Sequence, residues 1–328
     1  MTVEASISIG CKGFVRLEAI KVKTCKDGSP ILDKNGNYIE ISKRILADWF
    51  PNKLLDSGRN RMGTNSDWLN CVQVGTNNTT PQATDTGLLG YIAGSSSIQE
   101  TITGAEASSP YFAWKRRRWR YGVGETAANL SEVGVGWSTA NGAYLVSRAL
   151  IVDGDGNPTT VTPLADEILD VWYEFRYYPP ETDVTGTVTL NGVDYNYTVR
   201  ASEVTVTETA DLIGTAIGEY SPGLVHQDWN AYDGTIGTLT QAPNGLSANG
   251  TQDPTNSPYS NNSYQRRMSI NCGTTGWNLA GGIRSIRIKT TAGRFQTQFG
   301  SVSGDNKIPK TDQFTMDMAW IISWSEAP

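Results

Sequence analysis

The sequence predicts an all-β protein, with tandem β-sandwich domains after an N-terminal hairpin and a short helix. Residues 168–178 alternate between apolar and polar side chains, the period of a half-buried strand. Asn191-Gly192 lies between two Thr- and Tyr-rich segments, which is a strong signal for a two-residue hairpin turn. The chain also has 10 Trp and 14 Tyr but only 18% charged residues. These aromatic side chains supply enough apolar area to fill compact cores.

The N-terminal elements follow from local patterns. Residues 6–24 form the first expected strand, and Asp-Gly and Asn-Gly signals at 27–28 and 35–36 indicate hairpin-like turns. A short helix is expected over 42–50, because a serine suited to an N-cap opens it and a proline follows it. A second helical pattern spans 54–62, with its apolar side chains on one face.

Period-two patterns dominate the rest of the chain. They predict strands at 67–74, 111–121, 132–137, 143–152, 168–178, 184–200, 268–271, 283–290, 295–299 and 314–324. A basic strand followed by a Gly-rich gap and a long strand occurs twice, which indicates an internal duplication. The expected organisation is an N-terminal hairpin and helix attachment region, a first β-sandwich, an acidic linker and a second β-sandwich, at 1–105, 106–200, 201–224 and 225–328.

Composition argues against several classes of partner. A net charge of −6 disfavours nucleic acids and membrane surfaces, because binding either needs clustered positive charge. No apolar run approaches the ~20 residues that cross a bilayer. The first residues carry no secretory pattern. We therefore expect neither membrane insertion nor export.

The sequence contains few of the residues and motifs that are typical of enzyme active sites. His226 is the only histidine and no GxSxG elbow is present, whereas Ser and Cys nucleophiles usually need a histidine base. No dinucleotide fingerprint occurs either. We expect no enzyme activity, no catalytic residues and no cofactor. Asp166, Glu167 and Asp170, with Glu132 on a neighbouring strand, leave glycan hydrolysis as a weaker alternative, since glycosidases use paired carboxyl groups.

No metal site is expected. Cys11, Cys25, Cys71 and Cys272 lack the close spacing of zinc ligands. Four reduced thiols are the favoured interpretation, with a Cys11–Cys25 bridge across the N-terminal hairpin as the alternative. The run Asp-Gly-Asp-Gly-Asn at 153–157 resembles the start of a calcium loop but lacks the later Gly and Glu. A β-turn is expected there.

The most conspicuous local feature is the strand at 114–121, which interleaves basic and aromatic residues. Its side chains divide between two faces, with Arg116, Arg118 and Arg120 together on one of them. Such mixtures also bind single-stranded nucleic acid. In an acidic chain, arginine stacked on tryptophan or paired across a subunit interface is favoured. The candidate interface residues are Trp114, Arg116, Arg118, Trp119, Arg120 and Trp172.

A second candidate surface lies in the polar segment 225–264. This segment is mostly Gly, Asn, Thr, Ser and Pro with occasional aromatic residues, which is typical of long loops. Aromatic and amide side chains on such loops suit contacts with sugars or proteins. The candidate receptor-loop residues are Trp229, Tyr232, Tyr259, Asn261, Asn262 and Tyr264.

Several patches in combination resemble tail-associated structural proteins of tailed bacteriophages. RILADWF at 44–50 and NRMG at 60–63 precede the pattern V-G-T-N-x-x-x-P-x-x-x-D-T-x-L at 74–88, in which Asn77 replaces the usual Gly. LSEVGVGW and SRAL within 130–150 resemble strands of phage fibre and tail-appendage domains. KT and IISW within 310–324 are similar to the chain ends in the same group.

The resemblance implies a virion component of the tail tip, baseplate or fibre, assembled in the host cytoplasm. It also implies contacts with other phage virion proteins and a homo-oligomer, a trimer or hexamer. It implies no catalytic residues. The alternative is a receptor-binding module of the same tail apparatus, which recognises a glycan or protein on the host surface.

Overall fold

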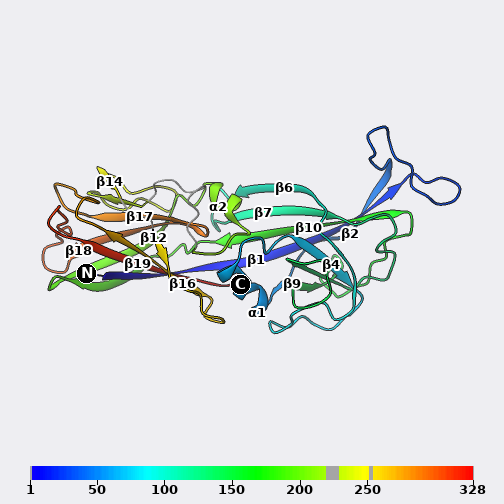
Figure 1. Cartoon of the computed structure of the whole chain (residues 1–328), viewed down its shortest axis with the longest axis horizontal. Coiled ribbons are helices and arrows are strands. Elements are labelled where there is room, and N and C mark those ends of the chain that lie inside the picture. The colour runs from blue at the N-terminus through cyan, green and yellow to red at the C-terminus, as the bar shows by residue number, and fades with distance from the viewer. Residues whose placement is uncertain (1, 219–228, 251–253, 328) are drawn as a thin grey trace. The chain divides into compact units, whose positions relative to one another are not determined.

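The computed structural model describes residues 2–218, 229–250 and 254–327, and it is nearly all-β (Figure 1). These residues form 19 strands and two short helices, α1 (Asp56–Thr64) and α2 (Glu208–Leu212). The all-β prediction is confirmed. Within the described ranges, no helix is long and apolar enough to cross a membrane.

The strands form three sheets. The eight-stranded sheet has the order β15 (Thr255–Asn256), β16 (Gln265–Cys272), β19 (Met316–Glu326), β1 (Thr2–Val22), β10 (Glu167–Tyr178), β7 (Ala113–Arg120) and β6 (Ile98–Ala105), and β2 (Glu40–Pro51) also pairs with β1. The six-stranded sheet has the order β11 (Val184–Leu190), β12 (Val193–Ser202), β18 (Gly293–Ser301), β17 (Ser285–Thr290), β13 (Asn230–Tyr232) and β14 (Ser247–Asn249). The five-stranded sheet has the order β3 (Lys53–Leu54), β9 (Leu145–Leu150), β8 (Glu132–Gly136), β4 (Cys71–Gly75) and β5 (Tyr91–Ser95).

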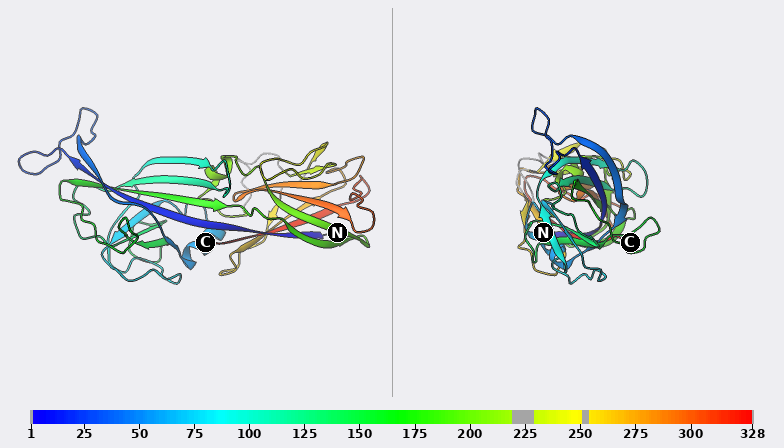
Figure 2. Two further views of the ribbon diagram at one scale, coloured as in Figure 1. Left: turned by 180° about the vertical axis from the view of Figure 1, so that it is seen from behind. Right: turned by 90° about the vertical axis from the view of Figure 1, so that its right-hand side faces the viewer.

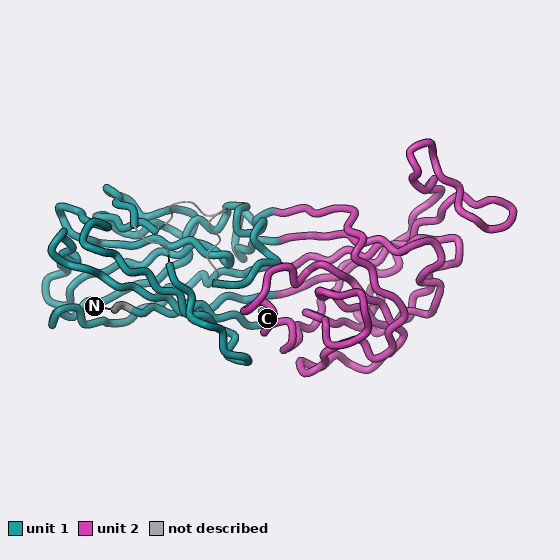
Figure 3. The backbone as a smooth tube through the Cα atoms, in the orientation of Figure 1, with its two compact units in different colours: residues 1–11, 104–114, 177–328 teal, residues 12–103, 115–176 magenta. Residues whose placement is uncertain are grey.

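Two compact units divide the chain, and neither is continuous in sequence (Figure 3). Unit 1 comprises 1–11, 104–114 and 177–328, and unit 2 comprises 12–103 and 115–176. The five segments are joined by four passages, which fall within β1, β6, β7 and β10. This division differs from the four consecutive segments expected from the sequence. The expected linker starts inside β12 and contains α2, and its last six residues lie outside the described ranges.

Unit 2 is a sandwich in which the five-stranded sheet packs against the inner face of β10 and β7. The rings of Trp68 and Phe175 meet edge to face, with 4.9 Å between centroids. The Trp119 indole donates to the Asn70 carbonyl at 2.9 Å. The odd-numbered residues of β10 in this unit form its core face, as predicted: Leu169, Val171, Tyr173 and Phe175. The strand is not half-buried as expected, however, because Asp170 and Glu174 on its opposite face are also buried.

In unit 1 the six-stranded sheet covers the face of β19 that carries its large apolar side chains. The Trp320 indole donates to the Thr297 hydroxyl at 3.3 Å, and Trp229 lies against the same indole. Asn191 and Gly192 adopt φ of +48° and +75° and join β11 to β12, as the hairpin signal predicts. The large apolar side chains on this face of β19 are buried, as expected: Met316, Met318, Trp320, Ile322 and Trp324.

The N-terminal region differs from expectation in one element. The helix predicted over 42–50 is wrong, because these residues form part of β2. Antiparallel pairing with β1 satisfies the backbone of this segment, whereas a helix of nine residues is marginal without packing. The helical pattern at 54–62 corresponds to α1. The turn signals are confirmed, with Gly28 and Gly36 at φ of +86° and +84°, and the loops that contain them project beyond the ends of β1 and β2 (Figure 2).

A glycine in α1 tests the packing of this helix on β9. A Cβ on Gly58 would come within 2.4 Å of the Val146 backbone. Gly58→Ala gains about 1 kcal/mol in helix propensity, but overpacking against fixed backbone costs about 1–3 kcal/mol or more. We expect a net loss of stability in urea denaturation. Gly154→Ala is the matched control, because nothing lies within 4 Å of its added Cβ. Equal stability of both variants would contradict this packing.

Candidate functional site

A buried ion pair joins two neighbouring strands of the five-stranded sheet. Glu132 on β8 and Arg148 on β9 are both 0% exposed. The Arg148 Nε donates to Glu132 Oε2 at 2.7 Å. Removing two charges from water is costly, so such groups are buried only when their charge and hydrogen bonds are matched.

The loop between β4 and β5 supplies the remaining partners. Arg148 also donates to Asp85 Oδ2 at 2.8 Å and to the Thr79 carbonyl at 2.9 Å. Glu132 Oε1 accepts the Gly90 amide at 2.6 Å. The loop is thereby fastened to the sheet through both members of the pair.

The glycine and asparagine of the 74–88 pattern have defined places around this pair. A Cβ on Gly75 would lie 2.6 Å from Glu132 Oε1, so a side chain there would displace the carboxylate. The Asn77 amide approaches the same oxygen at 3.4 Å, and Asn77 Oδ1 accepts the Thr79 amide at 2.7 Å. The patches at 74–88, 132–136 and 147–150 therefore meet in one network. The sequence showed these patches as separate and gave no sign that their charges pair.

The candidate interface strand β7 divides its side chains as predicted. Arg116, Arg118 and Arg120 are partly exposed on one face, called here the outer face of unit 2. Trp119 is 0% exposed and lies in the core. A partner cannot reach a fully buried indole, so Trp119 is removed from the candidate interface. Trp114 belongs to unit 1.

The arginines of the outer face cover buried carboxylates on β10. Asp170 is 0% exposed and binds Arg118 at 3.1 Å and Arg120 at 2.7 Å. Glu174 is 3% exposed and accepts Arg116 Nε at 3.0 Å and Arg176 Nε at 2.6 Å. Replacing one of these arginines would leave a buried carboxylate short of a partner, so it would affect folding as well as any interface.

Aromatic rings share the outer face with these arginines. The Arg116 guanidinium lies 4.9 Å from the Trp49 ring centroid, and that of Arg118 lies 5.1 Å from Trp172. The Trp172 indole donates to buried Glu18 at 2.9 Å. Guanidinium groups and indoles thus form a layer above the carboxylates, and Trp172 belongs to this layer.

Hydrogen-bonded cations hold several carboxyl groups of unit 2 in the charged form. Burial raises the pKa of Glu18, but hydrogen bonds from Lys43 and Trp172 outweigh it, so the pKa is lowered overall. The hydrogen bond from Arg44 lowers the pKa of Glu167, and Lys21 lowers that of Asp166. A glycosidase acid needs a raised pKa. Asp166 and Glu167 therefore have the opposite electrostatics to a general acid.

The candidate receptor loop splits into a buried and an exposed part. Trp229 is 5% exposed and Tyr232 is 8% exposed. The Trp229 carbonyl accepts the Trp277 indole at 2.9 Å. Both residues contribute to the core of unit 1, so they are removed from the candidate recognition surface. Long polar loops around them concealed this burial in the sequence.

The other four receptor-loop candidates lie close together in the β15–β16 hairpin connection. The Tyr259 ring stacks on Trp324, with 5.8 Å between centroids. Asn261 and Asn262 are exposed, and Tyr264 is partly exposed. The candidate recognition surface is thereby reduced from six residues to these four.

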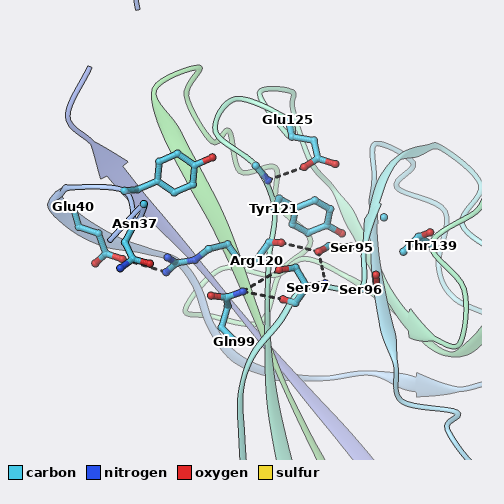
Figure 4. Close-up of a pocket in the computed structure, with 14 residues that line it drawn as sticks. Asn37, Glu40, Ser95, Ser96, Ser97, Gln99, Arg120, Tyr121, Glu125 and Thr139 are labelled. Carbon is cyan, nitrogen blue, oxygen red and sulfur yellow. Dashed lines mark hydrogen bonds and ion pairs between the residues drawn. The ribbon is translucent and has the colours of Figure 1, made fainter. Parts of the chain in front are cut away.

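A polar pocket of about 760 Å³ lies in unit 2 (Figure 4). Sequence reasoning missed it, and the triple serine at 95–97 was its only local signal. The lining residues come from four segments: the start of β2 with the turn before it, the β5–β6 turn with the adjoining strand ends, the end of β7 with the turn after it, and the turn after β8. They are Gly36, Asn37, Tyr38, Glu40, Gly94, Ser95, Ser96, Ser97, Gln99, Arg120, Tyr121, Gly122, Glu125 and Thr139.

The remaining motifs form local structure. Asp153 Oδ1 accepts the amides of Asp155 and Asn157 at 3.0 and 2.9 Å, which is the expected turn. All four cysteines are free, and only Cys25 is exposed. Among the described residues, no group of three or more His, Cys, Asp or Glu side chains could hold a metal ion. His226 lies outside the described ranges.

Comparison with protein-family models, curated proteins and solved structures finds no match for this chain. Three features of the chain bear on its function: the network of Glu132, Arg148 and Asp85, the outer face of unit 2, and the polar pocket.

The buried pair can be tested by removing one or both of its charges. Arg148→Met leaves Glu132 buried without its cation, so we expect a loss of about 3–5 kcal/mol in the free energy of unfolding. Adding Glu132→Gln to it should recover part of that loss, because the fully buried carboxylate is then neutral and only the partly exposed Asp85 has lost its cation. Arg200→Met, which removes the partly exposed pair with Asp183, should cost about 1 kcal/mol or less. Similar losses for Arg148→Met and Arg200→Met in urea denaturation would contradict the assignment.

Proposed function

We propose that this chain is a structural component of a tailed-phage virion, in the tail tip, baseplate or fibre, with homo-oligomeric contacts and contacts to other virion proteins. The observation that carries the proposal is the Glu132–Arg148–Asp85 network. Its residues belong to the patches that resemble phage tail proteins, and they bind one another and the backbone. In this chain the residues of these patches thus stabilise the fold, which supports a structural role.

The connectivity of the chain supports a mechanical role. Each of the four passages between the two units lies within a β-strand. Force along the chain would therefore be shared by hydrogen-bonded strands.

The outer face of unit 2 supports association with neighbouring subunits. Arginine and aromatic residues are enriched at protein interfaces, and here both form a layer above buried carboxylates. Ile45 on β2 lies opposite Glu18 in the strand register and is 53% exposed. A partly exposed layer of this composition next to a free apolar side chain suits a second copy of the chain.

Charge placed on the outer face should weaken assembly without unfolding the chain. We expect wild-type protein to form a trimer or hexamer in mass photometry and Ile45→Arg to shift it toward the monomer. Leu246→Arg is the matched control, because Leu246 is 72% exposed and belongs to unit 1. Circular dichroism checks that both variants fold. A monomeric wild type, or equal assembly of both variants, would contradict the interface.

Location on the particle tests the virion role itself. Cys25 is the only exposed cysteine, so a maleimide-linked gold particle marks the protein at one site. When labelled protein is incorporated during assembly, we expect gold at the tail in electron micrographs of purified particles. Cys25→Ser protein provides the unlabelled control. Particles that contain none of the protein would refute the proposal.

A further inference from the structure

The polar pocket of unit 2 has the size of a small-molecule site. Its volume of about 760 Å³ falls within the range of ligand pockets, about 300–1,000 Å³. Side chains from separate segments of the chain converge on it (Figure 4). Glu40 comes from β2, Ser95 to Ser97 come from the end of β5 and the turn after it, and Glu125 comes from the segment after β7. The opening is thus built by several elements that one sandwich holds in place.

Part of this lining is held in place by its own hydrogen bonds. The Ser95 hydroxyl donates to the Arg120 carbonyl at 2.7 Å and accepts the Ser97 amide at 3.2 Å. The Gln99 amide donates to the Ser97 hydroxyl at 2.9 Å. Glu125 Oε2 accepts the Gly122 amide at 2.7 Å. A ligand would therefore meet groups whose orientation is already set, which lowers the entropy lost on binding.

The charges of the pocket disfavour an anionic ligand. Arg120 is its only cationic side chain, and this guanidinium already binds Asp170 at 2.7 Å and Glu40 at 3.3 Å. Glu40 and Glu125 add two carboxylates to the lining. A phosphate or sulfate would find no free cation and would face like charge.

An apolar ligand is equally disfavoured. Hydroxyl, amide and carboxylate groups dominate the walls, and covering them without hydrogen bonds would cost free energy for each group. A polyhydroxylated ligand avoids this cost, because each of its hydroxyls can both donate and accept. Carboxylates accept from such hydroxyls, and serine and glutamine side chains can serve in either role. Tyr38 adds an aromatic side chain to the lining.

We propose that this pocket binds a neutral saccharide. Glu40 and Glu125 accept hydrogen bonds from sugar hydroxyls, Ser96 and Gln99 complete the polar contacts, and the part-buried Tyr38 packs against an apolar face of a sugar ring. The site is distinct from the Tyr259–Tyr264 surface in unit 1 and does not rest on the virion role, so either can fail alone.

The test uses the full chain and defined oligosaccharides. An array of neutral glucose-, galactose- and N-acetylglucosamine-containing oligosaccharides is compared with sialylated and sulfated ones, and the best neutral binder is then titrated by calorimetry. We expect binding to neutral members. Ser96→Trp, which fills the opening, should weaken it by about tenfold or more, equal to about 1.4 kcal/mol. Glu125→Gln keeps the size of the side chain and should also weaken binding.

Ser108→Trp is the matched control, since Ser108 is an exposed serine outside the pocket, and its affinity should equal that of wild type. Circular dichroism and thermal melting confirm that all variants fold. The proposal is overturned if no neutral oligosaccharide binds at millimolar concentration, or if anionic ones bind better. It is also overturned if neither Ser96→Trp nor Glu125→Gln lowers the affinity.

Discussion

The buried Glu132–Arg148 pair is the constraint on which the five-stranded sheet and its β4–β5 loop depend. Each charge is 0% exposed, so each must be matched within the protein or the sandwich pays the cost of burying it. Arg148 matches Glu132 on the next strand and then binds Asp85 and the Thr79 carbonyl. A loop that could otherwise move freely is therefore fixed by an electrostatic requirement of the sheet beneath it.

Much of the fold could be predicted because strand period and turn chemistry are local. The core face of β10, the Asn191-Gly192 hairpin and the buried apolar face of β19 were all predicted and are confirmed. Partners far apart in sequence were not predictable, and the parallel pairing of β1 with β19 is the clearest case. Periodicity also shows which residues share a face but not what covers it. Trp119 and Trp229 therefore looked like surface candidates. In the structure they are buried by residues distant in sequence, Trp119 near Asn70 and Trp229 near Trp320.

The same limit explains the candidate sites. The sequence correctly grouped Arg116, Arg118 and Arg120, but their carboxylate partners on β10 are about 50 residues away. The polar pocket is assembled from four separate segments of the chain, so no single sequence motif indicated it. The outer face and the pocket meet at Arg120, which binds Asp170 of the outer face and lines the pocket. Assembly and ligand binding in unit 2 would therefore share one residue.

Native-state hydrogen exchange tests the central claim, that the resembling patches build architecture around a buried pair. The Gly90 amide is bonded to Glu132 and the Thr76 amide to the Gly90 carbonyl. Both should exchange only through global unfolding and match the core strands β4 and β8 in protection. Exchange as fast as that of the exposed residues 26–29 would mean that the loop opens independently, and would contradict the account.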